Sequence, residues 1–186
     1  MNHNEFLQQI HRRIAIVSVG GSAIRNQGAS GMVDDARSYF KDSIALDEFF
    51  SAMKDETSYR MFLDKHTIYL RDKFREGGRR WGAARKGLNL FFRDLVYNKF
   101  ITEEFGLSQD FNLFNDEIKY LEVPLDSFVA QGLCDMPNLQ LPKWKSIKEL
   151  TPGTSELFQI SALQVAKELK VARVHLDLIL WRQPSE

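Results

Sequence analysis

Apolar side chains recur at helical spacing in two neighbouring stretches near the middle of the chain. The first covers residues 57–74 and is followed by the pair Gly77-Gly78, a typical signal for the end of a helix. The second covers residues 88–96, and its apolar positions follow the period of an amphipathic helix. A basic segment that contains a glycine, residues 79–86, lies between them. The pattern predicts a helix, a glycine-bearing hairpin and a second helix.

The rest of the chain shows helical rather than strand patterning. A glycine- and serine-rich stretch at residues 18–31 reads as an irregular loop, and an acid-rich connection spans residues 98–121. No strand-like alternation persists, and no repeat or long linker divides the chain. Further helices are expected at residues 1–17, 32–39, 46–53, 127–132, 154–169 and 171–181, with a short one opening at residues 141–144. We therefore expect an all-α fold in one domain, residues 1–186, with the hairpin motif at about residues 57–100.

The second hairpin helix is preceded by Gly82-Ala83-Ala84-Arg85-Lys86, and its first turn is expected to carry the last two of these residues. The segment resembles the G-h-G-x-K hairpin of the helix-hairpin-helix DNA glycosylase superfamily, with Ala84 where the family has its second glycine. The resemblance implies a glycosylase-like fold of two helical lobes around a central cleft. It also puts Lys86 at the position of the catalytic lysine of the bifunctional members. Glycines in such a hairpin let backbone N–H groups approach a DNA phosphate closely.

Two further segments resemble the same superfamily, in the same order along the chain. Residues 121–130, LEVPLDSFVA, are similar to the family segment that carries its essential aspartate, which corresponds to Asp126. Residues 175–181, HLDLILW, are similar to the "LDxxLW" helix that closes these proteins. The resemblance covers roughly the last two-thirds of the chain.

Within the superfamily, the chain most resembles the archaeal 8-oxoguanine DNA glycosylase branch. The base pocket of that branch uses an Asp and a Trp four residues apart on the closing helix, and a Gln near the N-terminus. These residues correspond to Asp177, Trp181 and Gln27. A flipped base would stack on Trp181 and form hydrogen bonds with the other two side chains. Trp81 and Trp144 are alternative stacking residues.

The residue types suit base excision. Cleavage of an N-glycosidic bond builds positive charge on the deoxyribose, which a carboxylate such as Asp126 stabilises. A neutral lysine amine attacks the anomeric carbon, and the Schiff base that results permits strand cleavage by elimination. Positive potential from Arg85 and from the helix N-terminus is expected to favour the neutral amine of Lys86.

Acidic and basic residues balance, with 25 of each, so a DNA-binding surface has to be local. Basic side chains crowd around the hairpin, and phosphate contacts are expected from Arg79, Arg80, Gly82 and Arg85. The chain has one cysteine, Cys134, which excludes a disulfide framework and an iron–sulfur cluster. Neither a metal nor another cofactor is expected.

We expect a DNA N-glycosylase with AP lyase activity that acts in the cytoplasm, as a monomer, on DNA containing a modified base. The base is either an oxidised purine such as 8-oxoguanine or a phage-type modified base, and the role is either DNA repair or antiviral defence. No apolar segment is long enough to serve as a membrane helix, so no membrane partner is expected.

Plainer interpretations stay open for each of these features. Lys86 alone suits a phosphate contact, and Asp126 alone suits a helix N-cap, a role compatible with catalysis. Asp177 and Trp181 alone suit a surface acid and a core anchor, and the loop that holds Gln27 suits a surface linker. The runner-up function is a non-catalytic helix-hairpin-helix module that binds DNA or a protein. A helical protein of unrelated activity is the third, because the net charge is zero.

Overall fold

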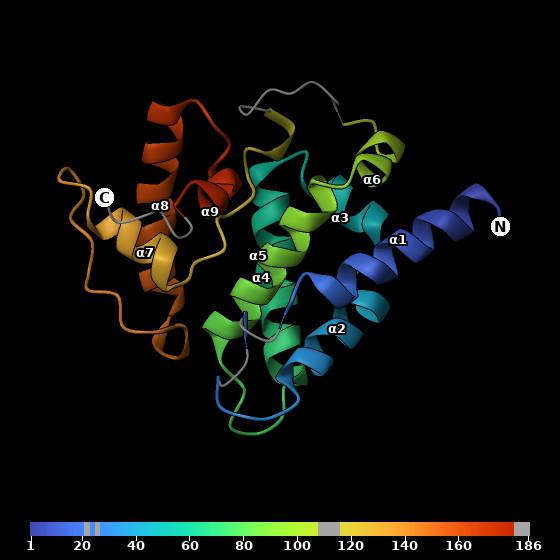
Figure 1. The fold of residues 1–186 in the computed structure, drawn as a ribbon, viewed down its shortest axis with the longest axis horizontal. Helices are drawn as coiled ribbons and strands as arrows, with labels where there is room; N and C mark the ends of the chain where they lie inside the picture. Colours follow the sequence, from blue (N-terminus) through green and yellow to red (C-terminus); the bar gives the residue numbers. More distant parts are fainter. Residues whose placement is uncertain (21–22, 25–26, 108–115, 181–186) are drawn as a thin grey trace.

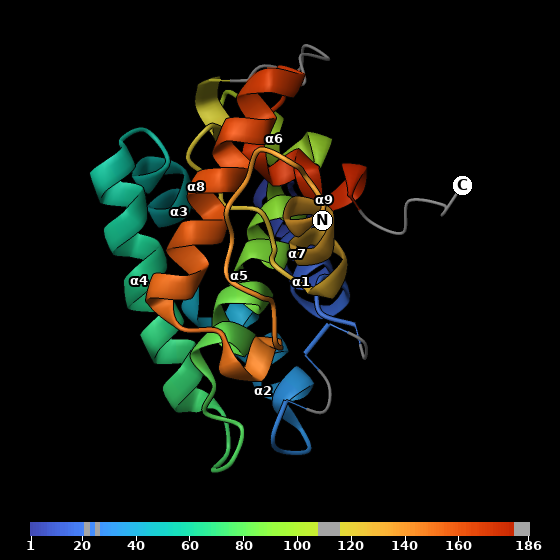
Figure 2. The same cartoon turned by 90° about the vertical axis from the view of Figure 1, so that its left-hand side faces the viewer.

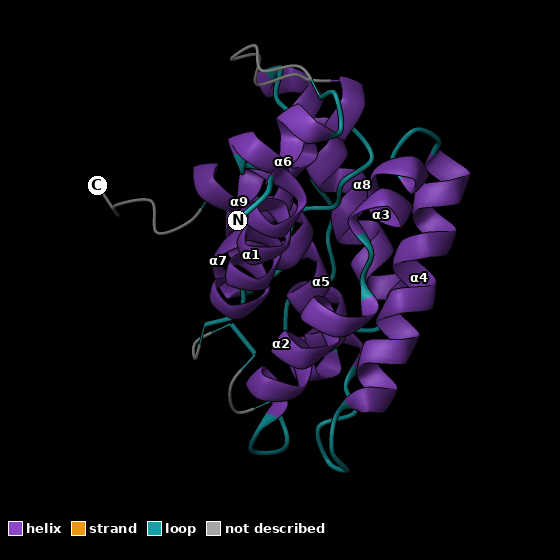
Figure 3. Cartoon of the chain, turned by 90° about the vertical axis from the view of Figure 1, so that its right-hand side faces the viewer, coloured by secondary structure: helices purple, strands orange, loops and turns teal. Residues whose placement is uncertain are grey.

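The computed structural model describes residues 1–20, 23, 24, 27–107 and 116–180. Within these residues every regular element is helical, as Figure 3 shows, so the expected all-α fold is confirmed. The α-helices are α1 (His3–Val17), α2 (Met32–Ser43), α3 (Leu46–Ala52), α4 (Glu56–Lys73), α5 (Trp81–Val96), α6 (Lys99–Glu104), α7 (Ser127–Cys134), α8 (Pro152–Leu169) and α9 (Leu176–Ile179). Short 3-10 helices are η1 (Asp116–Ile118), η2 (Ile147–Glu149) and η3 (Arg173–His175). None of the described helices is long and apolar enough to cross a membrane.

Helix α5 is the central element of the fold (Figure 1). α4 packs along it, α1 and α2 cover one part of its surface, and η2 and α8 cover another. Its buried residues therefore lie on nearly every side of the helix, from Gly82 to Leu95. A helix buried in this way has to bury its charged side chains too, and α5 carries several.

Buried hydrophobic side chains form two clusters. The first draws on α1 to α6 and is centred on two stacked ring pairs, Phe40 with Phe91 at 4.7 Å and Phe49 with Phe92 at 4.5 Å between centroids. The second cluster is formed by residues of α7, α8 and α9 and of the extended segment before α7. Phe158 of α8 belongs to it and is fully buried. Figure 1 shows α7 and α8 on one side of α5 and α1 to α3 on the other.

The helical hairpin is present, but its turn lies earlier than expected. α4 ends at Lys73, residues 74–80 form the turn with Gly77 at a left-handed φ of 82°, and α5 begins at Trp81. Gly82 therefore lies in the first turn of α5 rather than in a hairpin loop. A Cβ on Gly82 would stand 2.3 Å from the carbonyl oxygen of Ile147 in η2, so the missing side chain permits helix packing. The expected DNA contact at Gly82 is corrected accordingly, because its backbone is buried.

Two other expected elements differ from the structure. Residues 141–146 form no helix, because Pro142 favours an extended residue before it and lacks a backbone donor. The last helix is also shorter than residues 171–181. Lys170 ends α8 in the left-handed conformation, Ala172 is extended, and only η3 and the short α9 follow before residue 180.

Gly82→Ala tests the close packing between α5 and η2. Alanine is favoured over glycine in a helix by about 1 kcal/mol, but the clash with Ile147 is expected to lower the free energy of unfolding by about 1–3 kcal/mol. Gly153→Ala is the matched control, because nothing lies within 4 Å of a Cβ there, and it should leave stability unchanged or slightly raised. Urea denaturation measures both; equal responses would contradict this packing.

A buried ion pair joins α5 to the segment before α7. Arg85 is 6% exposed, and its Nε and Nη2 donate to the two carboxylate oxygens of Glu122, each at 2.8 Å. Its Nη1 donates to Asp64 at 2.7 Å and to Thr67 at 3.0 Å, both on α4. The expected phosphate contact by Arg85 is thus corrected: its guanidinium lies below the surface and is already paired with carboxylates.

Glu122 depends on this pairing for its charge. Burial raises the pKa of its carboxyl, but the charges of Arg85 and Arg173 and the hydrogen bonds from Arg85 and Asn89 outweigh burial. The pKa of Glu122 is therefore held below its ordinary value of 4.5. A carboxyl whose pKa falls on folding stabilises the protein above its unfolded pKa, and this stability is lost as the pH falls through the folded pKa.

Glu122→Gln is expected to lower the free energy of unfolding by about 3–5 kcal/mol near neutral pH, because it leaves buried guanidinium charge unbalanced. The variant should also lose stability less steeply than the parent chain as the pH falls below about 5. Urea denaturation across this pH range measures both effects. Glu149→Gln, at an exposed position, is the control and should change stability by less than about 0.5 kcal/mol. Parent-like stability of Glu122→Gln near neutral pH would refute the role given to the pair.

Candidate active site

A cleft of about 630 Å³ opens beside α5 and brings together residues that lie far apart in the sequence. Its lining comes from the loop after α1, from α5, from the start of α7, from the segment before η2 and from α9. Four residues expected at the site line it: Gln27, Lys86, Asp126 and Asp177. Its volume lies in the range of small-molecule pockets, and it is large enough for a nucleobase.

Lys86 and Asp126 form the centre of the cleft. Lys86 Nζ lies 3.3 Å from Asp126 Oδ2, and the lysine is only 7% exposed. Asp126 Oδ1 accepts hydrogen bonds from the backbone N–H groups of Phe128 and Val129, at 2.9 and 3.0 Å. The carboxylate therefore caps α7 with one oxygen and pairs with the lysine through the other.

The extended segment before α7 is held in place by Gln159 of α8. The side chain of Gln159 donates to the carbonyl oxygen of Val123 at 2.8 Å and accepts from its N–H at 3.1 Å. Glu122 is bonded to Arg85 from the other side. Because the backbone is fixed at both of these residues, Asp126 reaches the cleft in one defined position.

Asp177 lies in the same cleft and is paired with an arginine. Arg93 Nη1 donates to Asp177 Oδ2, and its Nε and Nη2 donate to Asp94 at 2.8 and 2.7 Å. Burial raises the pKa of the Asp177 carboxyl above its ordinary value, while Arg93 acts in the opposite direction. Arg93 therefore contacts one oxygen of the Asp177 carboxyl group and joins α5 to α9 at the cleft.

Arg93 was not expected at the site. It lies seven residues, or two turns, after Lys86, so both side chains project from one face of α5. The sequence shows a basic residue seven positions after Lys86, and this helical spacing could have predicted Arg93 at the site.

The remaining expected base-pocket residues are placed as follows. Gln27 is partly buried and lines the cleft from the loop after α1. Trp181 lies outside the described residues. Trp144 lines the cleft and makes an edge-to-face contact with Phe158, with 5.5 Å between the ring centroids. Trp81 instead borders a different cavity, where the Arg85 guanidinium lies over its ring.

The expected phosphate contacts divide into two pairs. Arg79 and Arg80 are exposed beside the start of α5, where Arg79 Nε donates to the carbonyl oxygen of Phe74 at 3.2 Å. Gly82 and Arg85 are buried. Since Glu122 and Asp64 balance the charge of Arg85, the part of the positive potential beside Lys86 that was expected from Arg85 is corrected as well.

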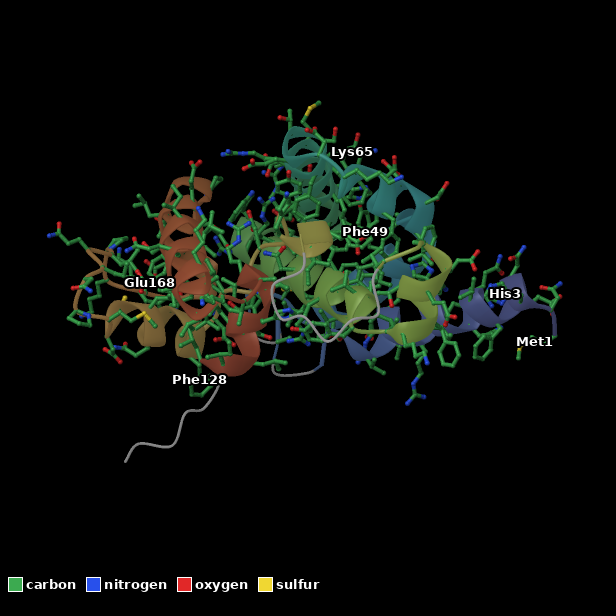
Figure 4. All side chains as sticks on the ribbon, turned by 90° about the horizontal axis from the view of Figure 1, so that it is seen from above. Met1, His3, Phe49, Lys65, Phe128 and Glu168 are labelled. Atoms are coloured by element: carbon green, nitrogen blue, oxygen red, sulfur yellow. The ribbon has the colours of Figure 1, made fainter. Side chains whose placement is uncertain are left out.

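The rim of the cleft is apolar and basic. Phe128, 45% exposed, and Leu178 project beside Asp126 and Asp177, and Figure 4 shows Phe128 at the molecular edge. Lys145 is exposed on the opposite wall and pairs with Glu149 at 3.5 Å. Among the described residues, no group of three His, Cys, Asp or Glu side chains is arranged to hold a metal ion.

Comparison of the chain with protein-family models, with curated proteins and with solved structures finds no match. A functional assignment therefore depends on the chemistry of the cleft itself.

The cap and charge of Asp126 can be separated by two substitutions. Asp126→Asn keeps an N-cap acceptor for α7 but loses the ion pair with Lys86, whereas Asp126→Ala loses both. The alanine variant is expected to be less stable than the asparagine variant by about 1 kcal/mol, because asparagine caps helices about as well as aspartate. Chemical denaturation of the two proteins measures the difference, and equal stability would show that the cap contributes nothing.

Proposed function

We propose that this protein is a DNA N-glycosylase with AP lyase activity that excises a modified base. The observation that carries the proposal is the pair of Lys86 Nζ and Asp126 Oδ2, 3.3 Å apart in a cleft that Gln27 and Asp177 also line. An amine nucleophile, a carboxylate and two hydrogen-bonding side chains are the groups that base excision requires.

Each group has a step in the reaction. Lys86 attacks as the neutral amine, so its ammonium proton is first lost to solvent, while Asp126, 3.3 Å away, stays ionised. The Nζ lone pair then forms a bond to the anomeric carbon, while the glycosidic bond breaks and its electron pair leaves with the base. Asp126 stabilises the positive charge that develops on the sugar. The bonded nitrogen gives up one proton, through Asp126, to the departing base and a second to the ring oxygen, so the ring opens to a Schiff base on Lys86. Asp126, ionised again, then accepts a proton from C2′, and β-elimination expels the 3′ phosphate.

The fold supports the proposal in two ways. A helix, a turn with two glycines and a second helix occur in α4, residues 74–80 and α5, as in a helix-hairpin-helix. Two hydrophobic clusters, one centred on α1 to α6 and one on α7 to α9, suit the two lobes that such glycosylases place around a cleft. The superfamily fold remains part of the proposal.

DNA binding would rely on local charge. Arg79 and Arg80 are exposed beside α5, and Lys145 is exposed at the cleft. With a formal net charge of zero, only such a local surface can attract phosphates, and binding should weaken steeply as salt increases. We propose a cytoplasmic monomer acting on DNA that contains an oxidised purine or a phage-type modified base, in repair or in antiviral defence.

Borohydride trapping tests the proposal. The protein is incubated with oligonucleotides carrying 8-oxoguanine, uracil, modified cytosines, an abasic site or no lesion. We expect a covalent adduct on at least one modified substrate, and Lys86→Gln should reduce its formation at least about a hundredfold. Lys145→Gln is the matched control, because Lys145 lines the same cleft but is not the proposed nucleophile. At a protein concentration that saturates the DNA, so that a weaker phosphate contact does not limit the reaction, this variant should still form the adduct.

The other outcomes are equally informative. Base release without any adduct would leave a monofunctional glycosylase that depends on Asp126. DNA binding with neither adduct nor base release would contradict the proposal and favour a non-catalytic helix-hairpin-helix module.

A further inference from the structure

A second cavity, of about 410 Å³, lies against a different face of α5 from the candidate active site. α4 and α8 form its walls, and Figure 2 shows these two helices next to each other. Arg85 and Glu122 border it from α5 and from the segment before α7. An exposed ion pair, Arg60 with Glu156 at 2.7 Å, joins α4 to α8 beside it. The lining shares no residue with that of the candidate active site.

The wall of the cavity contains a buried hydroxyl whose proton has no acceptor within the described residues. Tyr59 of α4 is 3% exposed, and its hydroxyl oxygen has no hydrogen bond of normal geometry within the described residues, although the backbone N–H of Glu122 lies near it. Burial, together with the charge of Glu122, raises the pKa of Tyr59, so its hydroxyl stays protonated. Leaving such a group unpaired costs about 1–3 kcal/mol, which a ligand that accepts its proton would recover.

The cavity is also lined by Arg173, a partly buried cation whose hydrogen bonds go to backbone oxygens. Arg173 is bonded to backbone carbonyl oxygens of Tyr120 at 2.9 Å, Leu121 at 3.1 Å and Gln159 at 3.3 Å. Each terminal nitrogen of a guanidinium has two N–H groups, so Arg173 keeps donors beyond these bonds. Burial lowers the pKa of Arg173, although the charge of Glu122 acts in the opposite direction. Arg85 is already paired with Glu122 and Asp64, and the exposed Glu156 with Arg60, so Arg173 is the cation on this wall that forms hydrogen bonds to backbone oxygens rather than an ion pair.

The remaining walls are largely apolar. Leu63 of α4, Ile160 and Leu163 of α8 and Val171 line the cavity. Trp81 lines it as well, with the Arg85 guanidinium 5.2 Å from its ring centroid. A flat ring placed among these side chains would be removed from water, and Trp81 offers an aromatic surface for contact.

We propose that this cavity binds a small organic anion with an aromatic ring. Its anionic oxygens accept hydrogen bonds from Arg173 and from the Tyr59 hydroxyl, and its ring packs against the apolar walls. The volume is within the usual range for such ligands. Carboxylates and phosphate monoesters share this chemistry. The proposal is independent of base excision, because none of these residues lines the candidate active site.

Isothermal titration calorimetry with four probes tests the proposal. Naphthoate and adenosine monophosphate are the anions, and naphthamide and adenosine are their neutral counterparts. We expect saturable binding of at least one anion, with its neutral counterpart at least about tenfold weaker because the charge-assisted bonds are lost. The anion that binds distinguishes a carboxylate site from a phosphate site.

Three variants locate the binding. Tyr59→Phe removes only the hydroxyl and should weaken anion binding about three- to tenfold. Ile160→Glu adds a negative charge at a 60% exposed position on the lining and should weaken it at least about tenfold. Leu157→Glu is the matched control, on the same helix at 51% exposure but outside the lining, and should bind as the parent chain does. Thermal unfolding confirms that each variant is folded.

Absence of saturable binding by both anions would overturn the proposal. Equal affinity for an anion and its neutral counterpart would also overturn it, as would parent-like binding by both Tyr59→Phe and Ile160→Glu.

Discussion

Cations on the buried surface of α5 have to be paired with carboxylates, and much of the fold follows from this requirement. A buried charge without a partner costs several kcal/mol. The basic side chains concerned are Arg85, Lys86 and Arg93, and their partners from later in the chain are Glu122, Asp126 and Asp177. These partners draw the extended segment before α7, and also α9, onto α5. The cleft is formed where these elements meet.

The pairs differ in a way that matches separate tasks. Arg85 and Arg93 each use several guanidinium nitrogens to bind two carboxylates, a geometry that fixes the orientation of the elements they join. Lys86 is a point charge, bonded to Asp126 at 3.3 Å where the pair borders the cleft. A lysine with one such contact can release its carboxylate and bond to a substrate atom more readily than an arginine that binds two carboxylates. In the proposed function the arginines orient the elements, and Lys86 carries out the chemistry.

Part of this arrangement could be predicted from the sequence. The periodicity of residues 57–74 predicted α4 closely, and the resemblance brought Gln27, Lys86, Asp126 and Asp177 to one site, where the structure also places them. The pattern of apolar residues does not show how a glycine is used, so Gly82 was expected in a loop rather than against Ile147.

Tertiary partners explain the other differences. Arg85 was expected to contact phosphates because its acid partner lies 37 residues away along the chain, beyond any local pattern. The same applies to Arg93 and Asp177, which are 84 residues apart. The second cavity depends on the relative placement of α4 and α8, which no single segment encodes. Local sequence thus predicted elements and residue types, whereas long-range charge pairing decided which basic residues are buried.

The most direct test of the account is to locate the covalent attachment after borohydride reduction on abasic DNA. Proteolysis and mass spectrometry of the trapped protein would identify the modified amine. If Lys86 is the nucleophile, the sugar remnant will be on Lys86, next to Asp126 in the cleft. Attachment to Lys145 on the opposite wall, or to the amino group of Met1, would contradict the assignment of Lys86 as the nucleophile.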